Sequence, residues 1–521
     1  MSRFSKESVI AVIGAGAMGA GIAQVAASAG HQVLLFDAVE GAAEQGIVNT
    51  AKGLSRLVER ERMTKQDADA LVSRIQAVSS IEDLAPANLV IEAIVERLDI
   101  KQQVCRQLEE ICSASTIIAT NTSSISITAI ASSLQRPQNL VGMHFFNPAP
   151  IMKLVEVISG LETDPQVATD IYNLSISWAK LPVHAKSTPG FIVNRVARSF
   201  YGEGLRINQE GATDFVTIDT LLRECGGFRM GPFELMDLIG QDVNYAVSCS
   251  VFEAFYHDQR FLPSLIQKEL VDAGHLGRKS GKGFYDYSQS SEKGNITKIP
   301  STVDLSSCPA AITVKGRLGI AEPLISLIEE KGIIVKRECE DDDEGMIKVG
   351  EAILMLTNGQ FTTQRAAESY QPNLISFDLA LDYQKASRIA LAPSDGASKE
   401  AVKAASGLFQ LIGKAVSIID DIPGMVVMRT VCALANEGFD AVNQNVCNEA
   451  AVDIAMKGGV NYPFGPIEWA NALGLNYTLA VIDNLMAVYG EDRYRASPLL
   501  RRKVAEKVLM AKGYSEQKGV C

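Results

Sequence analysis

A histidine and a glutamate, spaced as on two neighbouring strands, are the residues of this 521-residue chain best suited to acid–base chemistry. His144 ends an apolar run, and Glu156 follows twelve residues later among Leu154, Val155, Val157 and Ile158. A histidine in this setting is more often packed than catalytic when it stands alone. However, a buried glutamate is costly unless it is paired, and a neutral imidazole base needs an acceptor that orients it. We therefore predict a His144–Glu156 pair that takes a proton from a substrate.

A glycine-rich turn near the N-terminus is suited to binding a pyrophosphate. It lies between an apolar run at 9–13 and a helical stretch, and it has the pattern G-x-G-x-x-G in Gly14, Ala15, Gly16, Ala17, Met18 and Gly19. Glycines permit a tight turn and a close approach of backbone N–H groups to phosphate, and a helix N-terminus adds positive potential. The pattern alone is weak and is shared by flavin enzymes, but the strand–turn–helix context strengthens it.

Asp37 indicates which dinucleotide the turn would bind. It ends a second apolar run, 33–36, about twenty residues after the glycines, where a carboxylate accepts hydrogen bonds from both ribose hydroxyls. A 2′-phosphate there would meet like charge, on the order of 4 kcal/mol unfavourable at close range. The next residues, 38–40, offer no compensating cation. NAD is therefore expected rather than NADP, although an ordinary aspartate in a turn at a strand end remains an alternative.

The apolar pattern around these residues alternates strands with helices. Further strand candidates lie at 89–93, 116–119, 140–144 and 154–158. This alternation predicts a Rossmann-type, doubly wound α/β domain over residues 1–187. Strand patterns then cease, and residues 188–287 are expected to form an all-α domain. Ser, Lys, Gly and Pro dominate the next segment, 288–310, which is typical of a linker.

The second half of the chain repeats the first at a constant offset of 234 residues. Pro189-Gly190 recurs as Pro423-Gly424, and Gly231-Pro232 recurs as Gly465-Pro466. A second copy of the helical domain is therefore expected at 421–521. The two copies should form an internal pseudo-dimer in which residues 232–239 pack against residues 466–473. A homodimer of whole chains also remains possible.

The segment between the helical copies, 311–420, is expected to be a degenerate Rossmann-like fold. At an offset of 300, Val314 stands where Gly14 was and Arg337 stands where Asp37 was, so the tight turn and the ribose acceptor are lost. At the offset of 234, Asp378 stands opposite His144 and Ala390 stands opposite Glu156. The second copy therefore lacks the candidate catalytic pair.

Composition excludes several classes of function. The net charge of 49 − 61 = −12 disfavours nucleic acid as the partner. Nine scattered cysteines without a CxxC pair or a histidine cluster indicate neither a metal site nor a disulfide framework. The uncharged stretch Val9–Gly30 is interrupted by glycines, so no membrane span is expected. The N-terminus lacks a secretion signal, and a cytoplasmic location is expected.

Three motifs carry a resemblance to a known family. Asn121-Thr122-Ser123-Ser124, HFFNPAP from His144 and PGFIVNR from Pro189 resemble the L-3-hydroxyacyl-CoA dehydrogenases, over Val9 to about Tyr287. The stretches MHFFNPAPIMKLVEVISG and LIGQDVNYAVSCSVF and the duplicated tail are most similar to family members that act on 3-hydroxyadipyl-CoA in phenylacetate catabolism. The resemblance implies NAD-dependent oxidation of (S)-3-hydroxyacyl-CoA to 3-ketoacyl-CoA.

The resemblance also implies residue roles. His144 would be the general base, Glu156 its partner, and Ser123 and Asn194 hydrogen-bonding residues around the reacting oxygen. The remaining implied contacts are Asn147 with substrate, Arg56 and Arg60 with the phosphates of coenzyme A, and Ala93, Glu96, Lys101 and Asn121 with the cofactor.

Structural roles compete with several of these assignments. Ser123 could cap a helix that begins near Ile125, and Asn194 could bond backbone. Glu96 with Lys101, and Arg56 with Arg60, could belong to solvated helix faces. Two other functions also remain open for the whole chain: a short-chain 3-hydroxybutyryl-CoA dehydrogenase and a non-catalytic nucleotide-binding scaffold.

Overall fold

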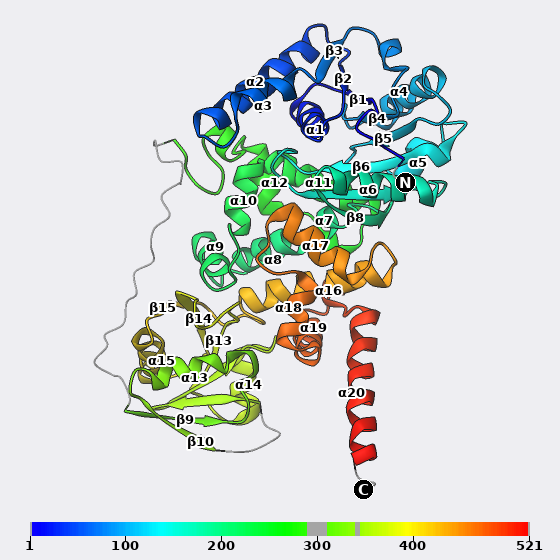
Figure 1. Cartoon of the computed structure of the whole chain (residues 1–521). Coiled ribbons are helices and arrows are strands. Elements are labelled where there is room, and N and C mark those ends of the chain that lie inside the picture. The colour runs from blue at the N-terminus through cyan, green and yellow to red at the C-terminus, as the bar shows by residue number, and fades with distance from the viewer. Residues whose placement is uncertain (1–2, 289–309, 339–343, 519–521) are drawn as a thin grey trace. The chain divides into compact units, whose positions relative to one another are not determined.

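The structure, a computed structural model, describes residues 3–288, 310–338 and 344–518, with backbone only for 511–518. Figure 1 shows the whole chain, which divides into two units by its internal contacts. Unit 1 comprises Met1–Arg195 and Gln444–Val460, and unit 2 comprises Val196–Asn443 and Asn461–Cys521. Residues 444–460 therefore belong to unit 1, although the sequence repeat assigns them to the second helical copy. The linker expected at 288–310 lies, except for its two end residues, outside the described part of the chain.

Unit 1 is built on an eight-stranded sheet in the order β3-β2-β1-β4-β5-β6-β7-β8. Strands β1 to β6 are parallel, whereas β7 is antiparallel to β6 and parallel to β8. The doubly wound fold predicted from the sequence is thus confirmed. The strands are β1 Ile10–Ile13, β2 Val33–Phe36, β3 Ile75–Val78, β4 Leu89–Glu92, β5 Ile117–Thr120, β6 Leu140–Phe145, β7 Leu154–Ser159 and β8 Leu181–Lys186.

The two edge strands, β3 and β8, carry a weak sequence signal and were not expected. In β3 only Ile75 is buried, and in β8 three of the six residues, Leu181, His184 and Lys186, are exposed. Edge strands face water along part of their length, so they lack the continuous apolar run that marks a buried parallel strand. The missed elements are therefore those with the weakest apolar pattern.

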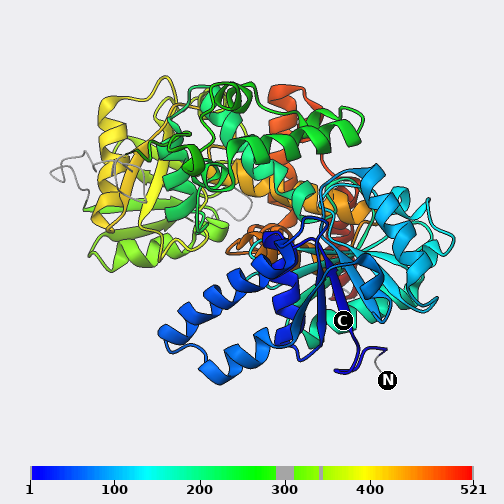
Figure 2. The same cartoon turned by 90° about the horizontal axis from the view of Figure 1, so that it is seen from above.

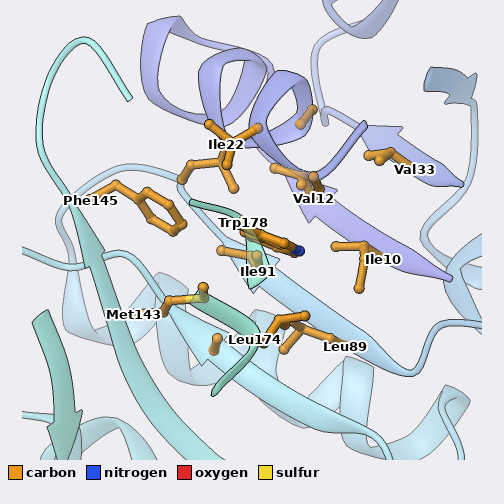
Figure 3. Packing of buried hydrophobic residues seen from close by; sticks show 14 of the residues in the cluster. Ile10, Val12, Ile22, Val33, Leu89, Ile91, Met143, Phe145, Leu174 and Trp178 are labelled. Atoms are coloured by element: carbon orange, nitrogen blue, oxygen red, sulfur yellow. The ribbon is translucent and has the colours of Figure 1, made fainter. Parts of the chain in front are cut away.

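The side chains of β6 alternate between the apolar core on one face of the sheet and the His144–Glu156 pair on the other. Figure 3 shows Met143 and Phe145 of β6 beside Trp178 and Ile22, in the core that α1 (Ala17–Ser28) and α6 (Pro165–Ser177) form with one face. Because successive side chains of a strand point to opposite faces, His144 lies on the other face. Glu156 is its direct register partner on β7 and shares that face.

Further helices complete unit 1. Helices α2 and α3 form a hairpin after β2, visible as the paired blue helices in Figure 2. Helix α17 comes from the far end of the chain and packs against β7 and β8. The helices of unit 1 include α2 Ala42–Glu59, α3 Lys65–Val72, α4 Leu98–Ile111, α5 Ile127–Ala131 and α17 Glu449–Val460. The short helix α7, Val193–Val196, contains the boundary between the two units.

In unit 2, helices of both sequence copies pack together. The first copy supplies α8 Arg198–Gln209, α9 Phe215–Glu224, α10 Pro232–Ile239, α11 Gln241–Ala254 and α12 Leu265–Asp272. The second copy supplies α16 Val427–Asn443, α18 Pro466–Leu473, α19 Leu475–Tyr489 and α20 Pro498–Lys518.

The copies meet through α8 and α16, and the predicted contact between residues 232–239 and 466–473 is wrong. Helix α10 packs on α8, α9 and α11, and it leaves Leu238 and Ile239 exposed. Helix α18 packs on α16 and α19 instead. The reason lies in α16, whose residues 427–432 and 434–441 are all buried, so this helix and not α18 provides the apolar centre.

The second sheet lies in unit 2 and has seven strands in the order β10-β9-β11-β12-β13-β14-β15. Strands β9 and β10 are parallel around α13, as expected for a degenerate βαβ unit, but β11 is antiparallel to both of its neighbours. The antiparallel pair β13 and β14 repeats β6 and β7. The elements are β9 Ala311–Lys315, α13 Pro323–Glu329, β10 Ile334–Glu338, β11 Met346–Val349, β12 Ala352–Leu356, α14 Thr362–Ser369, β13 Leu374–Phe377, β14 Arg388–Pro393, α15 Lys399–Leu411 and β15 Ala415–Ile418.

A buried arginine joins α16 to α8. The Nε atom of Arg429 lies 2.6 Å from Glu203 Oε2, and its Nη1 lies 3.1 Å from Glu210 Oε2. Burial opposes the charged form of Glu203, but Arg429 and two further arginines outweigh burial and lower the pKa of this carboxyl. Breaking one side of such a pair leaves a charge uncompensated in the interior.

We expect Arg429→Met to reduce the free energy of unfolding by about 3–5 kcal/mol, because Glu203 would lose its nearest cation. The double variant Glu203→Met/Arg429→Met should show a smaller reduction in the free energy of unfolding. Since its folded pKa is lowered, Glu203 stabilises the fold above its unfolded pKa and ceases to do so as the pH falls. Urea denaturation at pH 7 and at pH 4 should therefore show a larger acid-induced loss for the parent than for the double variant, and equal losses would contradict the assignment.

Candidate active site

The glycine turn lies where the strand order reverses, between β1 and β4. Gly14 has a φ of +96°, and a Cβ atom there would lie 2.5 Å from the Ala93 carbonyl oxygen. A Cβ atom on Gly19 would lie 1.7 Å from the Gly14 carbonyl oxygen. Gly16 differs, because a Cβ atom there would meet nothing within 4 Å. Gly14 and Gly19 are thus required by packing, whereas Gly16 faces open space at the N-terminus of α1.

The N-terminus of α1 fits an anion. Its N-cap residue, Gly16, makes no side-chain capping bond, and its first turn contains no acidic residue. The first backbone N–H groups of a helix have no intrahelical acceptor and carry positive potential. The open space before Gly16 therefore has the donors that a dinucleotide pyrophosphate needs.

Asp37 holds the turn together from the end of β2. Its Oδ2 accepts the Ala15 N–H at 2.6 Å, and its Oδ1 accepts the Val39 N–H at 2.9 Å. The side chain is partly exposed, and each carboxylate oxygen can accept a second hydrogen bond. The arrangement is compatible with ribose recognition, which stays a prediction.

A buried ion pair follows β4. Lys101 on α4 is fully buried, and its Nζ lies 2.6 Å from Oε1 of Glu92, the last residue of β4. Thr120 donates a hydrogen bond to the other oxygen of Glu92 at 2.8 Å. The solvated-face alternative for Lys101 is therefore wrong. Glu92 was not expected from the sequence, although a single glutamate closing an apolar strand signals a buried partner.

Glu96 is fixed between Lys101 and the loop after β5. Its Oε2 lies 3.3 Å from Lys101 Nζ, and its Oε1 accepts hydrogen bonds from the Thr122 hydroxyl and the Ser123 and Ser124 backbone. Burial opposes the charged form, but Lys101 and these donors outweigh burial and lower the pKa of Glu96. This carboxylate therefore remains charged and holds the loop that carries Ser123.

Ser123 and Asn194 are adjacent, but the contact between them runs to backbone, so the structural alternative for Asn194 stays open and the contact of both residues with substrate stays a prediction. Asn194 Nδ2 donates to the Ser123 carbonyl oxygen at 3.4 Å. Ser123 does not cap the following helix, because α5 begins later and Ser126 accepts its capping bond from Ala129. Asn121 accepts the Phe145 N–H at 2.8 Å and so fixes the end of β6 beside His144.

His144 and Glu156 form the predicted pair. The distance from His144 Nδ1 to Glu156 Oε2 is 2.7 Å, and Glu156 is fully buried while His144 is 6% exposed. Since a carboxylate only accepts, Nδ1 carries the proton in the neutral imidazole and Nε2 is left as the basic nitrogen. The second oxygen, Oε1, accepts the backbone N–H groups of Ile192 and Val193, both at 3.0 Å.

Aromatic rings and a lysine fix the surroundings of His144. The ring of Phe146 lies 4.5 Å from that of His144, and Phe191 lies 5.8 Å away, centroid to centroid. Lys180 was not expected from the sequence. Its Nζ donates to the carbonyl oxygens of Ala149 and Met152, and burial lowers its pKa to about 8. This lysine holds the loop that follows His144.

In the second sheet, an aspartate binds the start of α16 at the position where the first sheet has His144. Asp378 accepts the backbone N–H groups of Val426, Val427 and Met428. By the 234-residue offset, Val426 and Val427 are the counterparts of Ile192 and Val193, and Asp378 is the counterpart of His144. A carboxylate at this helix start thus recurs in both halves, whereas the imidazole occurs in only one. The structural task belongs to the carboxylate, and the histidine is the addition.

Three residues with implied substrate contacts lie at the surface. Arg56 and Arg60 are exposed on and just after α2. Asn147 is exposed on the loop after β6. Their contacts with coenzyme A and with substrate stay predictions, and a solvated helix face remains the alternative for the two arginines.

Comparison with known proteins agrees with this geometry. The 3-hydroxyacyl-CoA dehydrogenase NAD binding domain matches residues 9–188, and the C-terminal domain of the same enzymes matches residues 190–287 and 424–517. The chain belongs to the 3-hydroxyacyl-CoA dehydrogenase family. It is an NAD-dependent 3-hydroxyacyl-CoA dehydrogenase with the helical domain in duplicate. The 3-hydroxybutyryl-CoA dehydrogenase reduced Rossmann-fold domain matches residues 354–423, within the degenerate segment.

Similar proteins include one that aligns over nearly the whole chain. The chain is 42% identical to 3-hydroxyadipyl-CoA dehydrogenase of Escherichia coli over 97% of its length and 98% of that relative. It is 41% identical to 3-hydroxybutyryl-CoA dehydrogenase of Clostridioides difficile over 54% of its length and 99% of that relative. A crystal structure described as 3-hydroxybutyryl-CoA dehydrogenase from E. coli superposes with a TM-score of 0.86 and 41% identity, covering 98% of this chain and 99% of that one.

Residues 3–288, 310–338 and 344–518 contain neither a metal cluster nor a membrane-spanning helix. No group of three His, Cys, Asp or Glu side chains in these ranges is arranged to hold a metal ion. No helix in the same ranges is long and apolar enough to cross a membrane.

Gly16→Ala should separate folding from cofactor binding. The added methyl group meets no protein atom, so the melting temperature should stay within about 2 °C of the parent. The methyl group would, however, occupy the space that a pyrophosphate enters, and NADH affinity should fall at least about tenfold. Fluorescence titration with NADH measures this loss. Unchanged affinity in a folded variant would show that the pyrophosphate does not bind at this turn.

Proposed function

We propose that His144 is the general base in the oxidation of a (S)-3-hydroxyacyl-CoA. The 2.7 Å contact with Glu156 carries this proposal, because it presents Nε2 as the free basic nitrogen. His144 Nε2 takes the proton of the 3-hydroxyl group, the C3–H bond breaks, and the C3–O bond becomes a carbonyl. NAD, when bound, accepts the hydride that leaves C3.

Glu156 supports this step in two ways. Its Oε2 orients the imidazole and stabilises the imidazolium that forms. Its Oε1 is held by Ile192 and Val193, so the carboxylate cannot rotate away from the histidine. Ser123 and Asn194 lie side by side and are proposed to hydrogen-bond the reacting oxygen.

The cofactor is proposed to lie along the carboxyl ends of β1, β4 and β5. Gly14, Ala15, Gly16, Met18 and Gly19 would surround the pyrophosphate, and Asp37 would accept from the adenine-side ribose. Ala93, Glu96 and Asn121 follow the next two strands and would line the remaining part of the site. Lys101 is only 1% exposed, so we propose that it positions Glu96 and does not contact the cofactor.

Two observations favour 3-hydroxyadipyl-CoA, and thus a role in phenylacetate catabolism. The first is the E. coli relative of that name, which matches 97% of this chain. The second is a cavity of about 210 Å³ within unit 2, whose lining contains no Asp or Glu and four arginines, Arg198, Arg206, Arg260 and Arg493. Arg206 and Arg260 are bonded to carboxylates of unit 2. Arg198 is buried, donates to Ser248, and follows Asn194 by four residues in the sequence.

The alternative substrate is 3-hydroxybutyryl-CoA. Two matches favour it: the E. coli crystal structure described as a dehydrogenase of this ester, which covers 98% of this chain, and the reduced Rossmann-fold domain at 354–423. The two esters differ in the carboxylate at the far end of the acyl chain, and that group would be recognised by a cation.

His144→Gln should lower kcat by about a hundred- to ten-thousand-fold, the usual contribution of a positioned general base. The reduction of acetoacetyl-CoA, followed by loss of NADH absorbance, measures this change. Circular dichroism and NADH titration should show a folded protein that still binds the cofactor. Turnover at the parent rate in such a protein would refute the assignment of the base.

The parent should show a higher kcat/KM for 3-hydroxyadipyl-CoA than for 3-hydroxybutyryl-CoA. Arg198→Met should lower kcat/KM about 10- to 100-fold for the first ester, as expected for a lost charged hydrogen bond, and leave the second within about twofold. Arg229→Met is the matched control, because Arg229 is exposed and lies outside the cavity lining. Equal losses for both esters would assign Arg198 a purely structural role.

A further inference from the structure

Helix α17 approaches the catalytic strands through a pair of glycines in its last turn. In Figure 1 this helix, drawn in orange, lies beside α7 and β8 within unit 1. A Cβ atom on Gly459 would lie 2.6 Å from Leu154 Cδ2, 3.1 Å from Val193 Cγ2 and 3.5 Å from Phe146 Cε1. The first distance is shorter than any ordinary contact of a methyl group. Only glycine permits this approach without movement of the neighbours.

Two of the three residues around Gly459 touch the catalytic pair directly. Phe146 packs its ring against the imidazole of His144, and Val193 donates its N–H to Glu156. The third residue, Leu154, lies two positions before Glu156 on β7. A Cβ atom at 459 would press on Leu154 and Val193, and a shift of Val193 would reach Glu156 through the backbone hydrogen bond, whereas the 3.5 Å distance to Phe146 is an ordinary contact.

The segment that precedes α17 is attached to unit 1 by polar contacts. The Val446 carbonyl oxygen accepts a hydrogen bond from the N–H of Lys186, the last residue of β8, at 2.9 Å. Gln444 accepts a hydrogen bond from the buried Arg195 at 2.9 Å. Burial, with the charge of Glu156 as a second cause, raises the pKa of Cys447 to about 12. Residues 444–460 are thus docked at several points.

The internal repeat provides a control for the glycine pair. Helix α9 is the counterpart of α17 and packs on β14, the counterpart of β7. There Glu224 and Arg388 form an ion pair at 3.0 Å, at the positions of Gly458 and Leu154. Cys225 occupies the position of Gly459 and is buried. The sheet without the histidine is therefore covered by a helix with side chains at both positions, whereas the sheet with the histidine is covered by a helix with glycines at both.

We propose that α17, from the second helical copy, braces the His144–Glu156 pair and that Gly459 is a positioning residue for the reaction. The inference rests on the proposed role of His144 as the base. On this proposal, the second half of the chain contributes a helix to the candidate active site in unit 1. The helix acts by fixing Phe146 and Val193, and none of its residues is required to touch the substrate.

The test compares Gly459→Ala with Gly458→Ala in the full chain. Both changes add one methyl group to the same turn of the same helix, but the Cβ atom at 458 would make only an ordinary contact, 3.4 Å from Leu154 Cβ. Gly459→Ala should lower kcat for acetoacetyl-CoA reduction at least about tenfold and leave the KM for NADH within about twofold. Gly458→Ala should keep both within about twofold of the parent.

A compensating change guards against simple misfolding. The variant Gly459→Ala/Leu154→Ala removes the atom that the new methyl group would meet first, and it should regain at least a third of the lost activity or, if Gly459→Ala does not fold, restore folding. Parent-like kcat in folded Gly459→Ala, equal losses in both glycine variants, or no rescue would each overturn the proposal. Activity in His144→Gln would instead refute the role of the base, so the two failures are distinguishable.

Discussion

Glu156 is a buried carboxylate that accepts hydrogen bonds from three donors at once, and the arrangement of the candidate active site follows from this constraint. One oxygen accepts two backbone N–H groups at the start of α7, and the other accepts the proton on His144 Nδ1. An uncompensated carboxylate at this depth would be strongly unfavourable. The sheet, the helix start and the imidazole are therefore held in one geometry by the same group.

The duplicated half separates the structural part of this arrangement from the chemical part. Asp378 binds the equivalent helix start with no imidazole, so the carboxylate is needed to satisfy backbone donors in both halves. Helix α17, from the second helical copy, packs on the first sheet. Helix α9, from the first helical copy, packs on the second sheet. The second half of the chain, which lacks the glycine turn and the histidine, thus contributes a helix that covers β7 and β8 of unit 1.

Much of the site could be predicted because its signals are local. Apolar runs marked six strands of the first sheet, the glycine spacing marked the turn, and a glutamate inside an apolar strand indicated a buried partner for His144. Signals that depend on distant partners were weaker. Lys101 has the pattern of a solvated helix, yet it is buried against Glu92, and Lys180 holds a loop that its own neighbourhood does not reveal. The contact expected between 232–239 and 466–473 failed for the same reason, since the repeat does not say which helix faces its counterpart.

The sequence by itself determined the doubly wound fold, the duplication at an offset of 234, the glycine turn and the pairing of His144 with Glu156. Each follows from spacing along the chain, because strand alternation and a fixed offset are local properties. Only the tertiary structure decided that α8 meets α16, that Glu96 holds the Ser123 loop, and that α17 lies against Phe146 and Val193. These contacts join residues far apart in the chain, and they depend on which buried surfaces and donors fit one another in three dimensions.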